Sequence, residues 1–359
     1  MKSPTKLRAG IIGLALSFYL LIQLLSQFPN FVESYYSNGL YPIITLILSN
    51  LSAQVSFSIS ELALWFVLLF GIPFIINRIK KKRLPLSRIL LNLITTLAVI
   101  YVWFYLCWGI NYLRPSLRTK LALDEVNLAI DSFDSTFVQI IKKSNQLNLA
   151  YSIKKISYID SVIDESYDEI MDLLNLPQIP GNRKNKSFTA NWLLNKTTTS
   201  GWFSPFFHEL HLNSDLFIFE LPFVLAHEKA HQMGITSEAD ANFLAHLVCT
   251  NASEPLCQYS GNFQVLGHFF RYLRTDSART HSYANLLNDG VKLDLEAVKQ
   301  RLKSHVGIIS KVSNKSYDLY LKANDVKEGM ANYSRVVSMI VRFQEKQKLR
   351  QKQATKKSF

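Results

Sequence analysis

Long apolar runs dominate the first third of the chain. Residues 9–28 are uncharged and rich in Leu and Ile. Residues 57–77 are apolar except for Glu61, and residues 89–112 carry no charge. A helix needs about 20 apolar residues to cross a bilayer, so each run predicts a membrane-spanning helix. Aromatic residues near the far end of the third run predict anchors at the membrane interface: Trp103, Tyr105, Trp108 and Tyr112.

From about residue 119 the apolar positions recur at helical spacing instead of forming long runs. This periodicity predicts helices over residues 123–146, 157–174, 262–274, 293–304 and 333–343. Residues 180–196 are polar and predict a loop or weak strand, whereas the aromatic residues of 200–213 predict a short strand or hairpin. The expected fold class is mainly α, with three N-terminal transmembrane helices followed by a helical domain that holds a small sheet.

Two segments leave alternatives open. Residues 35–56, between the first two runs, are apolar again at 41–51 and predict either an interfacial or a re-entrant helix. In the predicted hairpin, His208 and His211 are either a second metal site or a pair exposed to solvent on the strand surface, and we favour the solvent-exposed pair.

The charge distribution predicts how the chain is oriented. Residues 1–118 contain 11 Lys and Arg against two acidic residues, and the basic ones flank the first run and fill the connection 78–88. The stretch 29–56 has no Lys or Arg, so the positive-inside rule places the N-terminus in the cytoplasm and the domain 119–343 outside the cytoplasmic membrane. The basic surplus avoids that domain, which argues against a nucleic-acid partner.

The remaining features concern the tail and the cysteines. Residues 344–359 are strongly basic and predict a disordered, solvated tail in preference to one attracted to anionic lipid. Cys249 and Cys257 would permit a disulfide in an oxidising compartment, but we favour two ordinary core thiols.

The motif with the clearest chemistry is His227-Glu228-Lys229-Ala230-His231. Two histidines four residues apart lie on one face of a helix, so both imidazoles can bind one metal ion. Glu228 falls beside that face, where it can take a proton from a water molecule that the metal activates. Glu238, at the start of a second helix, is placed to supply a third ligand.

The surrounding residues support this arrangement. Pro222 suits the first turn of the motif helix and Gly234 its end, while Ser237 begins the next helix in capping-box form. Asn242, one turn after Glu238, is placed to accept a hydrogen bond from a ligand imidazole. Lys229 should point away from the metal, towards solvent or lipid headgroups.

The stretch AHEKAHQMG at 226–234, with SE at 237–238 and ANFL at 241–244, resembles the domain of unknown function 3810 family. Matching pieces elsewhere are WGINYLRP at 108–115, YSG at 259–261 and YDLYLKAN at 317–324. The family consists of bacterial membrane proteins similar to gluzincin metallopeptidases. The resemblance implies a zincin-like α+β domain, Zn²⁺ bound by His227, His231 and Glu238, and Glu228 as general base and acid. Gluzincins usually carry Asp where this chain has Asn242.

We therefore expect a membrane-anchored zinc metallopeptidase that hydrolyses peptide bonds of a peptide or protein substrate outside the cytoplasmic membrane, in contact with membrane lipid. An oxyanion donor is also needed, and the candidates are Tyr333, Tyr259 and His268. Two alternatives remain: a non-catalytic membrane protein whose zinc fastens two helices, and an extracytoplasmic peptide sensor that works through a partner.

Overall fold

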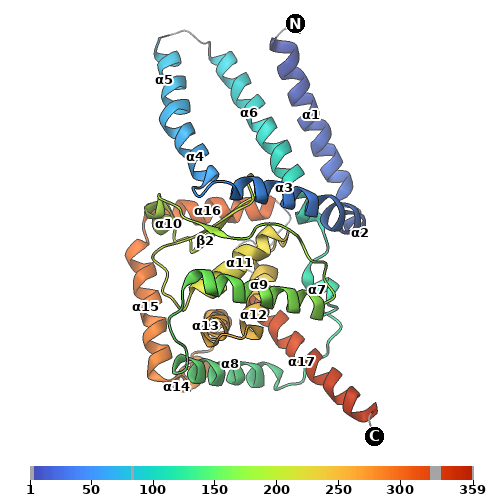
Figure 1. The fold of residues 1–359 in the computed structure, drawn as a ribbon, viewed down its shortest axis with the longest axis vertical. Helices are drawn as coiled ribbons and strands as arrows, with labels where there is room; N and C mark the ends of the chain where they lie inside the picture. Colours follow the sequence, from blue (N-terminus) through green and yellow to red (C-terminus); the bar gives the residue numbers. More distant parts are fainter. Residues whose placement is uncertain (1–3, 82–84, 324–332, 358–359) are drawn as a thin grey trace.

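The computed structural model describes residues 4–81, 85–323 and 333–357. Figure 1 shows three helices rising from one end of a mostly helical domain, and the C-terminal helix leaving the domain at the opposite end. The expected combination of apolar N-terminal helices, a mainly helical domain and a small sheet is confirmed.

Three helices are long and apolar enough to span a membrane, as predicted: Lys6–Leu25, Ile59–Lys80 and Leu86–Cys107. They correspond to α1 (Pro4–Leu25), to α4 (Ile59–Phe66), η2 (Val67–Gly71) and α5 (Ile72–Lys80) in succession, and to α6 (Leu86–Cys107). Only 6%, 11% and 0% of their apolar windows are buried within the protein. Such exposed apolar helices are typical of surfaces that face lipid.

The third span ends earlier than the sequence predicted. Helix α6 stops at Cys107, and the 3₁₀ helix η3 (Gly109–Leu113) follows inside the domain. Trp108, expected to be an interfacial anchor, is only 6% exposed and belongs to the domain core, so that prediction was wrong. An indole suits a core and a membrane interface equally well, and the sequence pattern does not distinguish them.

The segment between the first two spans lies across the end of the domain. It comprises α2 (Pro29–Phe31), the π-helical η1 (Val32–Leu40) and α3 (Tyr41–Ala53). Figure 1 shows α3 at the level where the spans meet the domain, running across their direction. Of the two alternatives that the sequence left open, this placement agrees with the interfacial helix.

The domain itself is built mainly from helices: α7 (Leu117–Lys120), α8 (Ser132–Asn148), α9 (Ile156–Leu173), α10 (Asn191–Thr197), α11 (Leu221–Gln232), α12 (Glu238–Asn251), α13 (Pro255–Tyr272), α14 (Ser277–Asn285), α15 (Asp289–His305), α16 (Ile308–Ala323) and α17 (Tyr333–Lys357). Helix α8 begins nine residues later than the predicted start at residue 123, because the preceding loop buries its apolar residues Leu123 and Val126 without being helical.

Helix α17 continues through the segment predicted to be a disordered tail, so that prediction was wrong as far as Lys357. Gln, Lys, Arg and Ala favour helix, and here they extend a helix that is already packed against the domain. Arg342 donates to the Val126 carbonyl at 2.7 Å and Lys346 to the Leu121 carbonyl at 2.6 Å. Figure 1 shows this end pointing away from the spans.

The sheet has the strand order β1-β3-β2. The predicted hairpin is confirmed as β2 (Gly201–Ser204) and β3 (Glu209–Leu212), which pair antiparallel, and β1 (Asn185–Lys186) runs parallel to β3.

Neither hairpin histidine faces solvent, which corrects that prediction. His208 is buried with its ring against Tyr41, and burial lowers its pKa to about 4. His211 stacks on Trp202, and its Nε2 lies 2.8 Å from the Ser58 hydroxyl. The strand surface that carries them is covered by α3 and the start of the second span, and that cover is not visible in the hairpin's own sequence.

Cys249 and Cys257 are both free and buried, as the favoured interpretation expected. Burial raises the pKa of the Cys257 thiol to about 12, so it stays protonated at neutral pH. Neither thiol has the character of a reactive cysteine.

Candidate metal centre

Helices α11 and α12 bring the motif residues together. Pro222 occupies the first turn of α11, where its missing N–H costs no hydrogen bond. Gly234 has a φ of +81°, which glycine adopts without strain, and it turns the chain back on itself. Ser237 then caps α12 by accepting a hydrogen bond from the Asp240 N–H, so Glu238 begins the second helix facing the first.

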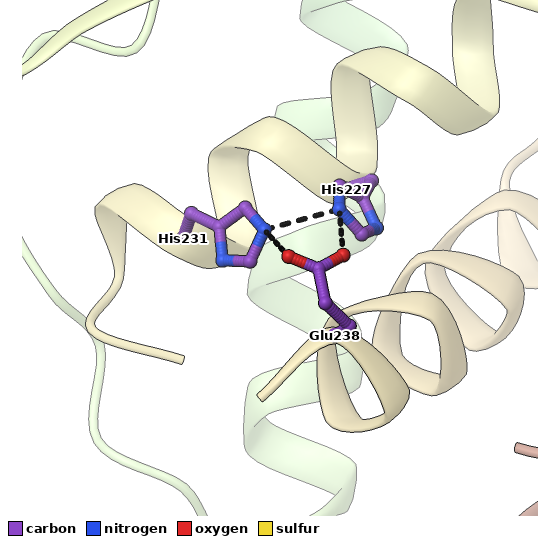
Figure 2. Close-up of side chains that lie close together, drawn as sticks. All are labelled: His227, His231 and Glu238. Atoms are coloured by element: carbon purple, nitrogen blue, oxygen red, sulfur yellow. Dashed lines mark hydrogen bonds and ion pairs between the residues drawn. The ribbon is translucent and has the colours of Figure 1, made fainter. Parts of the chain in front are cut away.

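The three predicted ligands converge on one spot (Figure 2). The Nε2 atoms of His227 and His231 lie 3.0 Å apart. Glu238 Oε2 is 3.3 Å from His227 Nε2, and Glu238 Oε1 is 3.4 Å from His231 Nε2. The ligand atoms of all three side chains lie within 4.8 Å of one another. Among the described residues, these three form the cluster of His, Cys, Asp or Glu side chains that could hold a metal ion.

This donor set fits a zinc ion. Zn–N bonds of about 2.0–2.1 Å in a tetrahedral site place two nitrogens roughly 3.3 Å apart, close to the 3.0 Å between the imidazoles. His231 Nδ1 lies 2.7 Å from the Ile235 carbonyl, which leaves Nε2 with its lone pair towards the site. His227 Nδ1 is buried and has no hydrogen-bond partner among the described residues.

Electrostatics also favour a cation between these groups. Burial raises the pKa of Glu238, but His231 and His227 more than offset this and hold it well below its usual value. Burial lowers the pKa of His231, yet the Glu238 carboxylate raises it to about 9. Both shifts show that this group of side chains favours positive charge between the imidazoles and the carboxylate, which a divalent ion can supply.

Glu228 lies beside the ligands and is almost completely buried. Burial raises its pKa, while the two histidines and a hydrogen bond from the Phe203 backbone lower it less. Gly201 of β2 makes room for this side chain, because a Cβ at residue 201 would lie 2.6 Å from Glu228 Oε1. Strand β2 therefore positions the carboxylate from the side opposite α11.

A cavity of about 670 Å³ opens over the centre. Residues from η3, β2, the hairpin turn, α11, α12, α13 and α16 line it, among them Tyr112, Trp202, Phe206, His268, Ser313 and Asn314. Glu238 keeps 32% of its side chain exposed, so the ligands are accessible from this cavity. A centre that opens into space of this size has room for a substrate next to the ion.

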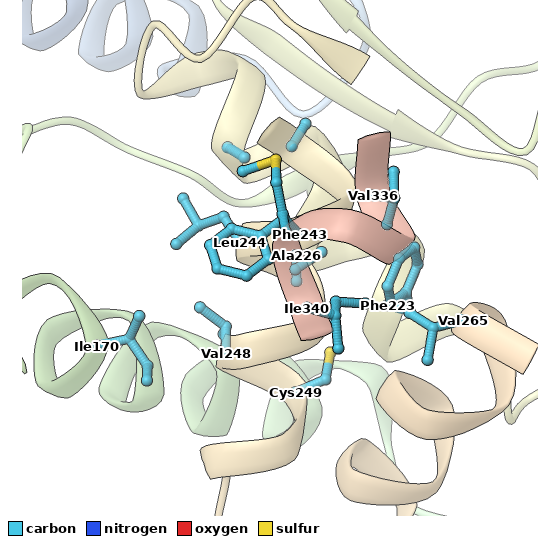
Figure 3. Close-up of a cluster of buried hydrophobic side chains, with 14 of the residues drawn as sticks. Ile170, Phe223, Ala226, Phe243, Leu244, Val248, Cys249, Val265, Val336 and Ile340 are labelled. Atoms are coloured by element: carbon cyan, nitrogen blue, oxygen red, sulfur yellow. The ribbon is translucent and has the colours of Figure 1, made fainter. Parts of the chain in front are cut away.

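The back of α11 anchors the centre in the core (Figure 3). Phe223 and Ala226 pack there with side chains from the neighbouring helices, including Ile170, Phe243, Leu244, Val248, Val265, Val336 and Ile340. The Tyr167 hydroxyl donates to the Ala226 carbonyl. The ligand helix therefore has little freedom to move.

Lys229 points away from the centre, as predicted, but it is not solvated. Its side chain is fully buried, and its Nζ lies 2.6 Å from Asp160 Oδ1 and 2.8 Å from Asp164 Oδ1 on α9. The expectation of solvent or lipid headgroups was wrong because α9, more than 60 residues earlier in the chain, packs on that face.

The remaining residues that the sequence proposed for the site, as an imidazole partner or an oxyanion donor, do not all lie near the centre. Asn242 lines the cavity, but among the described residues it is not the partner of His231 Nδ1, which faces the Ile235 carbonyl. His268 also lines the cavity, and burial lowers its pKa to about 4. Tyr259 is buried in the core, where its hydroxyl donates to Asp294 at 2.5 Å, so it is not an oxyanion donor. The side chain of Tyr333 lies outside the described residues.

Three further residues hold the end of α11, and none of them was predicted from the sequence to do so. The Trp108 indole donates to the His231 carbonyl at 2.8 Å, and the Tyr41 hydroxyl donates to the Gln232 carbonyl at 2.6 Å. Arg114 donates to the Gly234 carbonyl at 3.3 Å and pairs with Glu33. Trp108 and Arg114 both lie in the segment 108–115, and the resemblance of this segment to the family was the available signal.

Comparison with known proteins gives one match. No curated protein and no solved structure matches the chain. The model of a family described as "Protein of unknown function (DUF3810)" matches residues 36–341. This match begins within η1, covers the second and third spans and reaches into α17. Because it includes most of the chain, the protein belongs to the DUF3810 family.

Proposed function

We propose that this protein is a membrane-anchored zinc metallopeptidase of the gluzincin type, which hydrolyses peptide bonds outside the cytoplasmic membrane. The observation that carries the proposal is the convergence of His227, His231 and Glu238 beside the buried carboxylate of Glu228. Two imidazoles, one carboxylate and an open side match zinc sites that hydrolyse substrates, whereas structural zinc sites have four protein ligands.

Each residue has a distinct role in this proposal. His227, His231 and Glu238 hold the ion, which when bound supplies Lewis acidity that polarises a carbonyl and acidifies water. Glu228 accepts the proton of the attacking water and passes it to the leaving amine. Strand β2 is an edge strand of the described sheet and lines the cavity, so an extended peptide can lie along it. His268 is the remaining oxyanion candidate that lines the cavity.

The test uses the full-length protein purified in detergent. We expect about one zinc ion per chain in the wild type and in Glu228→Gln, and none in His227→Ala. Cleavage of a fluorogenic peptide mixture should fall by roughly a hundredfold or more in Glu228→Gln. Glu296→Gln, on the exposed face of α15, is the matched control and should cleave like the wild type. Equal cleavage by wild type and Glu228→Gln would refute the peptidase function.

A structural zinc site is the second candidate, and one contact favours it. The Glu238 carboxylate lies against both imidazoles, so an ion there would fasten α12 to α11. In that case Glu228→Gln would leave the thermal midpoint unchanged, while His227→Ala would lower it. The open cavity over the ligands is the reason that we favour catalysis.

A further inference from the structure

Helix α3 is amphipathic, but its polar face is turned towards the domain and its apolar face outwards, the reverse of a surface helix on a water-soluble protein. Its polar residues Thr45, Ser49 and Ser52 are buried against the domain. Ser49 Oγ accepts a hydrogen bond from the Asn182 N–H at 2.9 Å, and the Ser52 carbonyl accepts one from Lys186 at 2.6 Å. The opposite face exposes the large apolar side chains of Ile43, Leu46, Ile47 and Leu51, together with Asn50 and Ala53. Water is a poor environment for this outer face.

Helix α16 exposes a second apolar surface at the same end of the domain. Ile308, Ile309 and Val312 are exposed there, flanked by the exposed Lys311 and Lys315. Figure 1 shows α16 at the level of α3, where the spans meet the domain. An apolar face bordered by lysines is typical of helices that lie in the headgroup layer of a membrane. Ser313 and Asn314 of the same helix line the cavity over the metal centre.

The turn between β2 and β3 connects this surface to the third span. The Phe206 carbonyl accepts a hydrogen bond from the Trp103 indole at 3.3 Å, and Phe206 packs near the ring of Phe104. Trp103 lies one helical turn inside α6, roughly 6 Å from its end. Phe206 also lines the cavity. One side chain therefore touches both the membrane-spanning helix and the space above the ligands.

We propose that a membrane-facing rim, formed by Ile47 and Leu51 of α3, Ile308 and Val312 of α16 and Phe206, lies in the interfacial layer of the bilayer that holds the three spans. The cavity then opens at the membrane surface, and its substrates are the membrane-proximal segments of polypeptides anchored in the same bilayer. The rim is continuous with the spans, which is why lipid is the occupant of its apolar faces. The substrate class rests on the proposed peptidase function.

The position of the rim can be tested without any cleavage assay. Ile47→Cys, Ile308→Cys and the control Leu149→Cys would each carry an NBD fluorophore in the full-length protein, reconstituted into phosphatidylcholine vesicles. The three native cysteines are buried and should not be labelled. Leu149 is 81% exposed and lies at the end of α8, on the far side of the domain from the spans. Nitroxide-labelled lipid should quench positions 47 and 308 about threefold or more over position 149.

The substrate class is tested in the same vesicles with a mixture of fluorogenic peptides, offered either soluble or with a double palmitoyl anchor. Anchoring should raise the cleavage rate by about tenfold or more, because peptide and cavity then share one surface. Ile308→Glu should lower the ratio of anchored to soluble cleavage, whereas the control Leu149→Glu should not change it.

The outcomes separate the two proposals. Equal lipid quenching at all three positions overturns the rim, and so does shielding of positions 47 and 308 from both nitroxide lipid and aqueous iodide, which would indicate a second copy of the chain on these faces. Equal cleavage of soluble and anchored peptides overturns the substrate class but leaves the peptidase intact. Cleavage of neither peptide by zinc-loaded protein overturns the peptidase and its substrate class, and the quenching result then decides the rim alone.

Discussion

Glu209 of β3 caps α4, the helix that begins at Ile59 at the start of the second span. Glu209 Oε2 accepts hydrogen bonds from the Ser60 backbone N–H at 2.9 Å and from its hydroxyl at 2.6 Å. Glu209 Oε1 accepts one from the Ile59 N–H at 2.9 Å and lies 2.7 Å from Lys186 Nζ. In return, Glu61 at the start of that span accepts the N–H groups of Thr189 and Ala190 at 2.8 Å each. Two buried carboxylates therefore join the span to the domain, Glu209 from β3 and Glu61 to the loop that precedes α10.

The first prediction concerns Glu209→Gln. Burial raises the pKa of Glu209, but Lys186 and the helix N–H groups hold it below the usual value of 4.5. A lowered pKa means that the carboxylate stabilises the fold above about pH 4.5, and that this contribution is lost as the pH falls through the lowered value. Glu209→Gln should lower the thermal midpoint near pH 7, where it removes the carboxylate that neutralises Lys186, at a cost of roughly 3 kcal/mol.

The measurement is the thermal midpoint of the purified protein between about pH 7 and pH 3. The difference between wild type and Glu209→Gln should shrink as the pH falls. Glu165→Gln, on the exposed face of α9, is the control and should follow the wild type throughout. A constant difference across the pH range would show that the charge of Glu209 does not stabilise the fold.

The second prediction concerns Gly201→Ala. The added methyl would meet Glu228 Oε1 at 2.6 Å and Val224 Cγ1 at 2.8 Å, so the carboxylate has to shift. A displacement of this kind at a general base lowers kcat by about a hundredfold, while zinc content should stay that of the wild type. Gly267→Ala on α13 meets nothing within 4 Å and should leave the rate unchanged. Unchanged cleavage by Gly201→Ala would argue against a role for Glu228 in proton transfer.

The third prediction concerns Trp108→Phe. Phenylalanine keeps an aromatic ring in the core but removes the donor to the His231 carbonyl. This carbonyl keeps a second hydrogen bond, from the Gly234 N–H at 3.0 Å. Loss of the indole hydrogen bond alone costs about 0.5–1.5 kcal/mol, so the thermal midpoint should fall. Trp192→Phe, at a side chain that is 56% exposed, should have little effect. If both variants were equally stable, the indole hydrogen bond would not contribute to holding α11.

The fourth prediction concerns Lys229→Met. The substitution removes the cation between Asp160 and Asp164 and leaves two carboxylates close together beside a buried methionine. We expect a loss of roughly 3 kcal/mol in the free energy of unfolding, measured by denaturant titration. Lys299→Met is the matched control, because its ion pair with Glu296 is exposed and contributes about 0–1 kcal/mol. A loss no larger than that of the control would show that the buried pair is replaceable.

The sequence was sufficient where the signal is local. Runs of apolar residues predicted the three spans, and the spacing of His227, His231 and Glu238 predicted side chains that the structure brings together. Both signals depend on helix geometry and on a turn at Gly234, which neighbouring residues determine.

The sequence was insufficient where a distant segment decides whether a side chain is buried and what it contacts. Lys229 looks like a surface lysine until α9 packs against it, and His208 looks like a strand-surface residue until Tyr41 covers it. Trp108 has the sequence context of a membrane anchor, yet it lies under the ligand helix. In each case the partner comes from another part of the chain, and no periodicity within the segment itself records it.

The end of α11 has a consequence for how much of the chain the metal centre requires. The carbonyls of His231, Gln232 and the following Gly234 accept hydrogen bonds from Trp108, Tyr41 and Arg114, which precede them by 123, 191 and 120 residues. All three lie in segments that precede α11 in the chain. The end of the ligand helix therefore depends on contacts with residues far away in the sequence, so a domain produced without the first 114 residues would lack these supports of its own metal centre.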